Sequence, residues 1–255
     1  MKIVRFKIHG EDQARIGLLE EETVSEISGS IFGPYTKTGA AFDANQVSFL
    51  APCDPSKVVC VGLNYKDHAE ESSSDLPEAP LLFLKPPSAV IGPGDNIVLP
   101  SNSRRIDFEA ELAVVISKRA KGVSEAEALE YVLGYTCLND VSARDFQMKD
   151  GQWTRAKGHD TFCPMGPAIA TGLNPLDLAV QAVSNGEIKQ DSRTSFLIFN
   201  VPYLIEYISR VMTLEPGDVI ATGTPAGVGP LVAGDTIEIK VEGVGSLKNP
   251  VVAES

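Results

Sequence analysis

The feature that most constrains the fold is a series of short β-patterned runs, most of them bounded by glycine or proline. Asn185-Gly186 adds a hairpin signal, because both central residues of a type I′ turn need positive φ. Helical patterns are few: residues 124–127 have the form of a capping box, and a second helix is predicted over 203–212. We therefore predict a β-rich α+β protein. The runs beyond the N-terminal region lie at 58–61, 81–84, 96–99, 108–116, 169–171, 195–199, 218–222 and 236–241.

The N-terminal region is predicted to be a small β-rich unit. Its β-patterned pieces, at 2–6, 15–19 and 23–27, are too short to bury much apolar surface. Residues 51–56 contain two prolines and an aspartate, which favour extended or turn backbone and are typical of a linker. We therefore predict a small domain at 1–52 and a larger domain at 53–255 that carries the chemistry.

The net charge of the chain indicates which kinds of molecule it can bind. The chain of 255 residues has 22 Lys+Arg against 34 Asp+Glu, a formal net charge of -12. Such a surplus repels nucleic acid and anionic membranes, so we expect a small-molecule partner. The first ten residues lack the apolar region of a signal peptide, and no run approaches the roughly 18 apolar residues of a membrane span. The four cysteines form no C-x-x-C pair, which suits reduced thiols, and we expect a soluble cytoplasmic protein.

Two glutamates form the first candidate site. In a strand over 108–116, Glu109 and Glu111 would share one face, with α-carbons about 6.6 Å apart. Ala113 and Val115 continue that face and make it apolar, which places the glutamates at the mouth of a pocket. Carboxylates held together there repel one another unless they are protonated or share a cation. The alternative is the solvated face of a half-exposed strand.

Asp140 offers a third carboxylate at the end of another apolar run. Its alternative role is to cap a following helical turn. Oxygen ligands from Glu109, Glu111 and Asp140 would suit Mg²⁺, Mn²⁺ or Ca²⁺. Zinc usually draws on His or Cys, and the chain has three histidines in all, so a conventional zinc site is not expected.

A histidine and a glutamate form the second candidate site. If His68 opens a helical turn, Glu71 lies on the same face and can accept a hydrogen bond from one imidazole nitrogen. The other nitrogen is then a candidate base, held in place as in a catalytic dyad. The polar segment 70–75 has the composition of a lid over a site. The alternative is an inert surface histidine beside acidic residues.

The glycine-rich segment 151–167 holds a third candidate, Lys157. An ammonium among small residues can hold a substrate carboxylate or stabilise an enolate, although a solvated loop lysine has the same pattern. Cys163 near His159 lacks an orienting third residue, so a thiol nucleophile is not favoured. Residues 223–229 match no nucleotide-binding motif and are predicted to form a binding loop.

Taken in order along the chain, these segments resemble the fumarylacetoacetate hydrolase family, specifically its prokaryotic-type members. The resemblance spans about residues 54–252, and such an ordered series is far more specific than any one motif. Residues 1–50 resemble the small N-terminal domain that often precedes this catalytic domain. The matching pieces are residues 61–65 with His68 and Glu71, residues 83–86, Glu109 with Glu111, residues 139–145, Lys157-Gly158 with Cys163-Pro164, and residues 223–225.

The resemblance implies a β-roll-like catalytic fold that is usually dimeric, so a homodimer is expected. It implies Mg²⁺ or Mn²⁺ on Glu109, Glu111 and Asp140. It also implies that His68 and Glu71 activate a water molecule on a lid that closes over a 2-oxo acid. Lys157 matches the active-site lysine of the family, and the positions expected to contact the substrate are Tyr65, Lys85, Arg144, Gln147 and Thr224.

The activity implied by the resemblance is metal-dependent hydrolysis of a carbon–carbon bond in a β-diketo or 2-oxo acid of acylpyruvate or fumarylpyruvate type. The leaving enolate would be held by the metal and Lys157. The same enolate serves an isomerase or decarboxylase of a 2-hydroxydienedioate, such as 2-hydroxyhepta-2,4-diene-1,7-dioate, or an oxaloacetate decarboxylase. A metal-stabilised binding protein without activity is the alternative from another class. All of these stay open at the level of the sequence.

Overall fold

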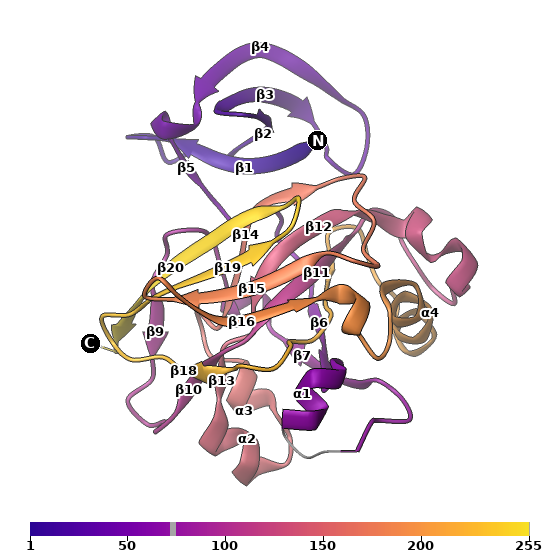
Figure 1. Ribbon diagram of the computed structural model, residues 1–255. Helices are drawn as coiled ribbons and strands as arrows, with labels where there is room; N and C mark the ends of the chain where they lie inside the picture. The colour runs from indigo at the N-terminus through magenta and orange to yellow at the C-terminus, as the bar shows by residue number, and fades with distance from the viewer. Residues whose placement is uncertain (72–74, 255) are drawn as a thin grey trace.

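The computed structural model describes residues 1–71 and 75–254, and its largest element is a sheet of twelve strands (Figure 1). The strands of this sheet are β1 (Lys2–Ile8), β2 (Arg15–Glu20), β3 (Thr23–Gly29), β4 (Tyr35–Asp43), β5 (Val47–Phe49), β6 (Val58–Gly62), β7 (Leu81–Lys85), β8 (Val90–Ile91), β11 (Ala110–Ile116), β12 (Val132–Asn139), β14 (Cys163–Ala170) and β17 (Val219–Ala221). Its order is β4-β3-β2-β1-β14-β12-β11-β17-β6-β7, with β5 beside β1 and β8 beside β14.

Two smaller sheets and four α-helices complete the described fold. A three-stranded sheet has the order β13 (Ser142–Ala143), β10 (Ile106–Phe108), β18 (Gly229–Pro230). A five-stranded sheet has the order β16 (Glu187–Arg193), β15 (Ala179–Ser184), β19 (Thr236–Val241), β20 (Gly245–Ala253), β9 (Ile97–Leu99). The helices are α1 (Lys66–Glu71), α2 (Arg144–Asp150), α3 (Thr154–Lys157) and α4 (Val201–Val211), and short 3₁₀ turns cover Ala44–Gln46, Pro87–Ala89, Glu125–Tyr131 and Thr194–Phe196.

Strand β11 lies between two apolar cores. Leu112, Val114 and Ile116 belong to the larger core, which also contains residues of β15, β19 and α4. Ala113 and Val115 point to the other face and pack in the second core with residues of β12 and β14. A strand covered on both faces reads as a continuous apolar run, as β11 does. The predicted β-rich α+β class is confirmed.

The N-terminal strands join the large sheet rather than standing apart from it. Lys2 and Ile3 of β1 pair with Ala170 and Ile169 of β14. Ile3 packs in the second core together with residues of β12 and β14. In Figure 1, β1–β5 lie at one end of the molecule and α1, α2 and α3 lie at the opposite end. Among the described residues, no helix is both long and apolar enough to cross a bilayer.

Several local predictions are confirmed. Asn185 and Gly186 have φ of 51° and 85° and join β15 to β16 as a hairpin. The helix predicted at 203–212 is α4, which begins two residues earlier because Asn200 accepts a hydrogen bond from the Tyr203 N–H at 3.0 Å.

Two other predictions are wrong. The helix expected after Ser124 is a 3₁₀ helix, and the Ser124 hydroxyl donates to the Glu127 carboxylate at 2.6 Å instead of capping a backbone N–H. Residues 195–199, which the structure describes in full, do not form the expected strand. Residues 194–196 form a 3₁₀ turn, and the N–H groups of Ile198 and Phe199 donate to the backbone and side chain of Asn64 instead of a strand partner.

Asp218 anchors the segment that leads into β6. Its side chain is fully buried, and it accepts hydrogen bonds from the N–H groups of Ser56, Lys57 and Glu215 at 2.8 to 3.2 Å. The Ser56 hydroxyl and the Lys57 ammonium also donate to it. Burial alone would raise the pKa of Asp218, but the hydrogen bonds from Glu215, Lys57 and Ser56 outweigh burial and hold its pKa below the ordinary value.

We predict that Asp218→Asn destabilises the protein by about 3 kcal/mol at pH 7, because an amide NH₂ would face donors that now meet an oxygen. The folded-state pKa lies below the ordinary value of 3.8, so this stabilisation is present at neutral pH and is lost as the pH falls through the folded-state pKa. Urea denaturation at pH 7, 4 and about 3 measures the difference, which should shrink at the lowest pH. Asp54→Asn, at an exposed ion pair with Arg5, is the control and should cost less than about 1 kcal/mol. Equal effects of the two variants would contradict the assignment.

Candidate metal centre and active site

Glu109 lies at a break between two strands. The prediction of one strand over 108–116 is wrong, because Asp107 and Phe108 pair within the three-stranded sheet while residues from Ala110 onward pair with β12. The Glu109 N–H donates to Oδ1 of Asn139 at 2.9 Å, so the backbone at the break stays satisfied. The chain passes from one sheet to another at the residue whose carboxylate was predicted to bind metal.

Asp140 reaches the same place from the neighbouring strand. Ala110 pairs with Asn139, and one residue further the Asp140 N–H donates to the Glu109 carbonyl at 2.9 Å. Carboxylate oxygens of Glu109, Glu111 and Asp140 lie within 4.8 Å of one another, and all three residues are buried. A solvated strand face is therefore excluded. Asp140 caps no helix either, since α2 begins at Arg144 with Ala143 as its N-cap.

Three cations contact this carboxylate cluster. The Lys157 ammonium donates to Glu109 at 2.8 Å and to Asp140 at 2.6 Å, and Arg144 pairs with Glu109 at 2.6 Å. Lys85 donates to Asp140 from behind the cluster. Burial alone would raise the pKa of Glu109, but Lys157 and Arg144 hold it well below the usual range. Burial likewise opposes the charge on Lys157, yet Asp140 and Glu109 raise the pKa of its ammonium.

Glu111 is the carboxylate that these cations leave uncompensated. Its hydrogen-bond donor is the Gly223 N–H at 2.8 Å, and in the described part of the chain no lysine or arginine forms an ion pair with it. Burial, then the charges of Asp140 and Glu109, raise its pKa well above the usual range. A buried set of three carboxylates, one of which pairs with no described lysine or arginine, fits Mg²⁺ or Mn²⁺, which prefer carboxylate ligands and would supply a cation to Glu111.

The predicted His68–Glu71 pair is formed on α1. His68 Nδ1 lies 3.1 Å from Glu71 Oε2, and the Gly227 N–H donates to the same carboxylate at 3.2 Å. At the other end of the helix Asp67 accepts from the His68 N–H at 2.7 Å and from the Ser192 hydroxyl at 2.8 Å. Contacts to β16 and to the 223–229 loop thus hold the helix in place. Of the predicted lid, residues 72–74 lie outside the described residues.

One cavity of about 420 Å³ brings most of the predicted site together. Tyr65 and Lys85 do not line it: both are fully buried, and Lys85 contacts the back of Asp140 and the Val141 carbonyl. Glu71 supports His68 from behind. The predicted residues that line the cavity are His68, Glu109, Glu111, Asp140, Arg144, Gln147, Lys157 and Thr224.

Gln190 was missed by the sequence analysis, and it connects the 223–225 loop to β11. It is fully buried on β16, and its Oε1 accepts from the Ala110 N–H at 2.8 Å. Its Nε2 donates to the Thr224 hydroxyl at 2.9 Å and to the Pro225 carbonyl at 2.8 Å. The residues around Gln190 in the hairpin strand do not distinguish it from a solvated glutamine. Its hydrogen-bond partners lie far away in the sequence, so its role becomes visible only in the folded structure.

Asp107 and the aromatic residues Phe83 and Trp153 were also missed as site residues. Asp107 is buried and accepts from Arg144 Nε at 2.9 Å, so it orients the guanidinium that holds Glu109. Phe83 and Trp153 line the cavity with ring centroids 5.2 Å apart. The sequence did contain a signal for Asp107: it lies two positions before Glu109, and alternate residues of a strand share a face.

His159 and Cys163 do not form a nucleophilic pair in this site. The His159 ring lies between Phe146 and Phe162, with centroid distances of 6.1 and 5.0 Å. Burial lowers the pKa of His159, which suits a neutral aromatic packing partner. Burial raises the pKa of the Cys163 thiol to about 12, so its thiolate is scarce near neutral pH.

Comparison with known proteins agrees with this geometry. Residues 57–252 match the family model of the fumarylacetoacetate (FAA) hydrolase C-terminal domain, and residues 1–52 match the model described as Rv2993c-like, N-terminal. The mitochondrial oxaloacetate tautomerase Fahd2a of Rattus norvegicus is 44% identical over 220 residues, which cover 82% of this chain and 70% of that one.

Two solved structures extend the comparison. The 2-hydroxyhepta-2,4-diene-1,7-dioate isomerase from Mycobacterium marinum is 48% identical with a TM-score of 0.93, and the match covers 100% of this chain and 99% of that one. Maleylpyruvate hydrolase from Sphingobium sp. SYK-6, solved with manganese(II) and pyruvate, is 32% identical with a TM-score of 0.84 over 100% of both chains. The chain belongs to the fumarylacetoacetate hydrolase family.

Proposed function

We propose that the protein is a divalent-metal-dependent hydrolase that cleaves a carbon–carbon bond in a β-diketo or 2-oxo acid of acylpyruvate or fumarylpyruvate type. The observation that carries the proposal is the meeting of a buried carboxylate cluster, the His68–Glu71 pair and Lys157 at one cavity. The similar maleylpyruvate hydrolase, which holds manganese and pyruvate in its solved structure, supports the same class of reaction.

Glu109, Glu111 and Asp140 would hold Mg²⁺ or Mn²⁺. The bound ion supplies Lewis acidity at the oxygen where negative charge develops on a 2-oxo acid. Arg144 and Lys157 keep Glu109 ionised as a ligand, since both contact its carboxylate. The Gly223 N–H fixes the orientation of Glu111 toward the same point.

His68 is the proposed general base. Glu71 accepts from Nδ1 and so orients the ring, and the Gly227 N–H keeps Glu71 in place. The imidazole removes a proton from water, whose oxygen bonds to the distal carbonyl carbon. The adjacent carbon–carbon bond then breaks, and its electron pair passes to the pyruvate-like fragment as an enolate. Lys157 stands at the same cavity to donate a hydrogen bond to that fragment, which recovers a proton from His68.

The second candidate function is isomerisation or tautomerisation of a 2-oxo acid. It is favoured by the names of the relatives at 48% and 44% identity. In this reaction the base moves a proton at the carbon beside the oxo group, and no carbon–carbon bond breaks. Decarboxylation of oxaloacetate through the same enolate is a further variant. A product assay that follows pyruvate, CO₂ and the enol absorbance with Mg²⁺ or Mn²⁺ separates the three outcomes.

We predict that Glu111→Gln stabilises the metal-free protein by about 1 kcal/mol and weakens Mn²⁺ binding more than tenfold. The substitution removes repulsion within the cluster and also removes a ligand oxygen. Thermal denaturation with EDTA and with Mn²⁺, together with calorimetric titration of Mn²⁺, measures both effects. Glu125→Gln, at an exposed position of a 3₁₀ helix, is the control and should change neither value. Unaltered Mn²⁺ affinity in Glu111→Gln would contradict the metal site.

We predict that His68→Ala lowers kcat for acylpyruvate hydrolysis by about 10²–10⁴-fold, because the water loses its base. Mn²⁺ affinity should stay within about twofold of the unsubstituted protein, since His68 is not among the carboxylate ligands. His9→Ala, at an exposed histidine of the N-terminal region, should leave kcat unchanged. Steady-state kinetics at saturating Mn²⁺ provide the measurement. Full activity of His68→Ala would rule out the proposed base.

A further inference from the structure

We propose that the substrate has an uncharged hydrocarbon group at the end away from the metal cluster, as in an acylpyruvate, and is not a dianion of fumarylpyruvate type. This inference rests on the proposed function and chooses within its substrate class. Two features of the cavity support it. The lysine and arginine that line the cavity already contact protein groups, and one wall of the cavity is apolar.

Both permanent cations that line the described cavity are engaged with protein groups. Arg144 donates hydrogen bonds from Nε to Asp107 and from Nη1 to Gln147, both at 2.9 Å, and its Nη2 forms an ion pair with Glu109 at 2.6 Å without a hydrogen bond. Lys157 donates to two carboxylates of the cluster. Both therefore act at the metal end. Elsewhere among the described lining residues, no lysine or arginine is available to pair with a second substrate carboxylate.

The wall that leads away from the cluster is apolar. It consists of Gly62, Leu81, Phe83 and Trp153, and we call it the apolar wall. The Lys157 ammonium lies 4.9 Å from the Phe83 ring centroid, and Phe83 meets Trp153 edge-on at 5.2 Å. A Cβ on Gly62 would lie 2.8 Å from the Trp153 ring and 2.9 Å from Leu81. The wall is thus continuous from Lys157 outward to Leu81.

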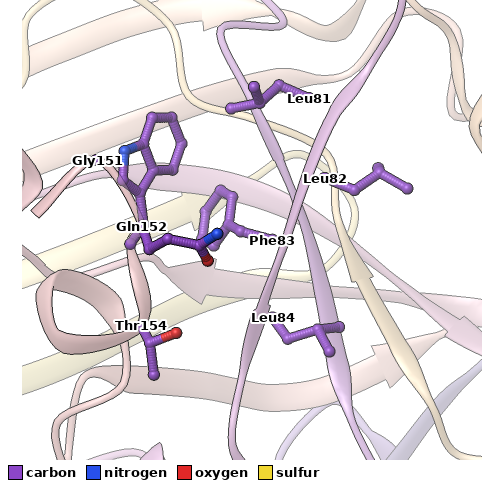
Figure 2. Close-up of a pocket in the computed structure, with 8 residues that line it drawn as sticks. Leu81, Leu82, Phe83, Leu84, Gly151, Gln152 and Thr154 are labelled. Atoms are coloured by element: carbon purple, nitrogen blue, oxygen red, sulfur yellow. The ribbon is translucent and has the colours of Figure 1, made fainter.

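A second hollow, lined by both apolar residues and uncharged polar residues, adjoins the apolar wall. It has a volume of about 420 Å³, and Figure 2 shows it between the strand that carries Phe83 and the segment that carries Thr154. It shares Leu81, Phe83 and Trp153 with the cavity, and none of its lining residues is charged. A carboxylate placed along this surface would lose water without gaining a cation, whereas each buried methylene should tighten binding about fourfold.

The test compares two ligands of equal chain length that cannot undergo the proposed cleavage. Both 2-oxohexanoate and 2-oxohexanedioate present a 2-oxo acid, but only the second ends in a carboxylate. Trp153 is the single tryptophan of the chain and lines the cavity, so its fluorescence in the presence of Mg²⁺ reports binding. We expect 2-oxohexanoate to bind at least tenfold more tightly. Equal affinities, or tighter binding of the dioate, would overturn the proposal.

A pair of variants tests whether the apolar wall makes this choice. Leu81→Arg adds a guanidinium at a residue that is 49% exposed and lines the cavity. The ratio of the dissociation constant of 2-oxohexanedioate to that of 2-oxohexanoate should fall at least tenfold in this variant. Leu176→Arg makes the same change at a leucine that is 47% exposed and lines neither the cavity nor the second hollow, and it should leave the preference unaltered. An unchanged preference in Leu81→Arg would show that the wall does not select the substrate.

The binding constants test the preference for an uncharged end group, whereas turnover of acylpyruvates tests the proposed hydrolysis, so the two can fail independently. If acylpyruvates are not cleaved but 2-oxohexanoate still binds in preference to the dioate, the proposed function fails and the substrate class stands. If acylpyruvates are cleaved and the dioate binds equally well, the hydrolase stands and the inference fails.

Discussion

The burial of three carboxylates within 4.8 Å of one another is the constraint on which the site depends. Removing such charges from water is costly, and their mutual repulsion adds to the cost. Lys157 and Arg144 offset the charge of Glu109, and Lys157 and Lys85 offset that of Asp140. Glu111 forms no ion pair with a lysine or arginine in the described part of the chain, and its pKa is raised by burial and by the other two carboxylates. Binding of a cation beside Glu111 would therefore be favourable. A cluster in which every carboxylate already had an ion-pair partner would gain less from binding a cation.

Holding this cluster requires all three sheets. The twelve-stranded sheet supplies β11 and β12, whose register places Asp140 across from Glu109. The three-stranded sheet contributes Asp107, which orients Arg144. The five-stranded sheet contributes Gln190, which locks the 223–225 loop onto β11, and Gly223 of that loop donates to Glu111. The break in the strand at Glu109 is where these sheets meet, so the irregularity positions the ligand.

The sequence revealed the cluster because carboxylates inside apolar runs conflict with the usual exposure of charge. Glu109 and Glu111 could be found in this way, and the i+3 spacing of His68 and Glu71 predicted the pair on α1. Asp140 was assigned by the family resemblance, because its position alone suited a helix cap equally well. The strand break and the role of Gln190 could not be found. Both depend on partners far along the chain: Gln190 bonds to Ala110, and the predicted strand at 195–199 fails because its N–H groups bond to Asn64.

The same electrostatics bear on the overall charge of -12. Three cations, Arg144, Lys157 and Lys85, contact the three carboxylates of the cluster, so without metal the cluster offers no net positive charge to an anionic acid. A divalent ion adds that positive charge. Substrate binding is then coupled to metal occupancy by charge alone, before any direct ligation is considered. An acidic protein can in this way bind an anion, because the field at the site is set by the cluster rather than by the surface.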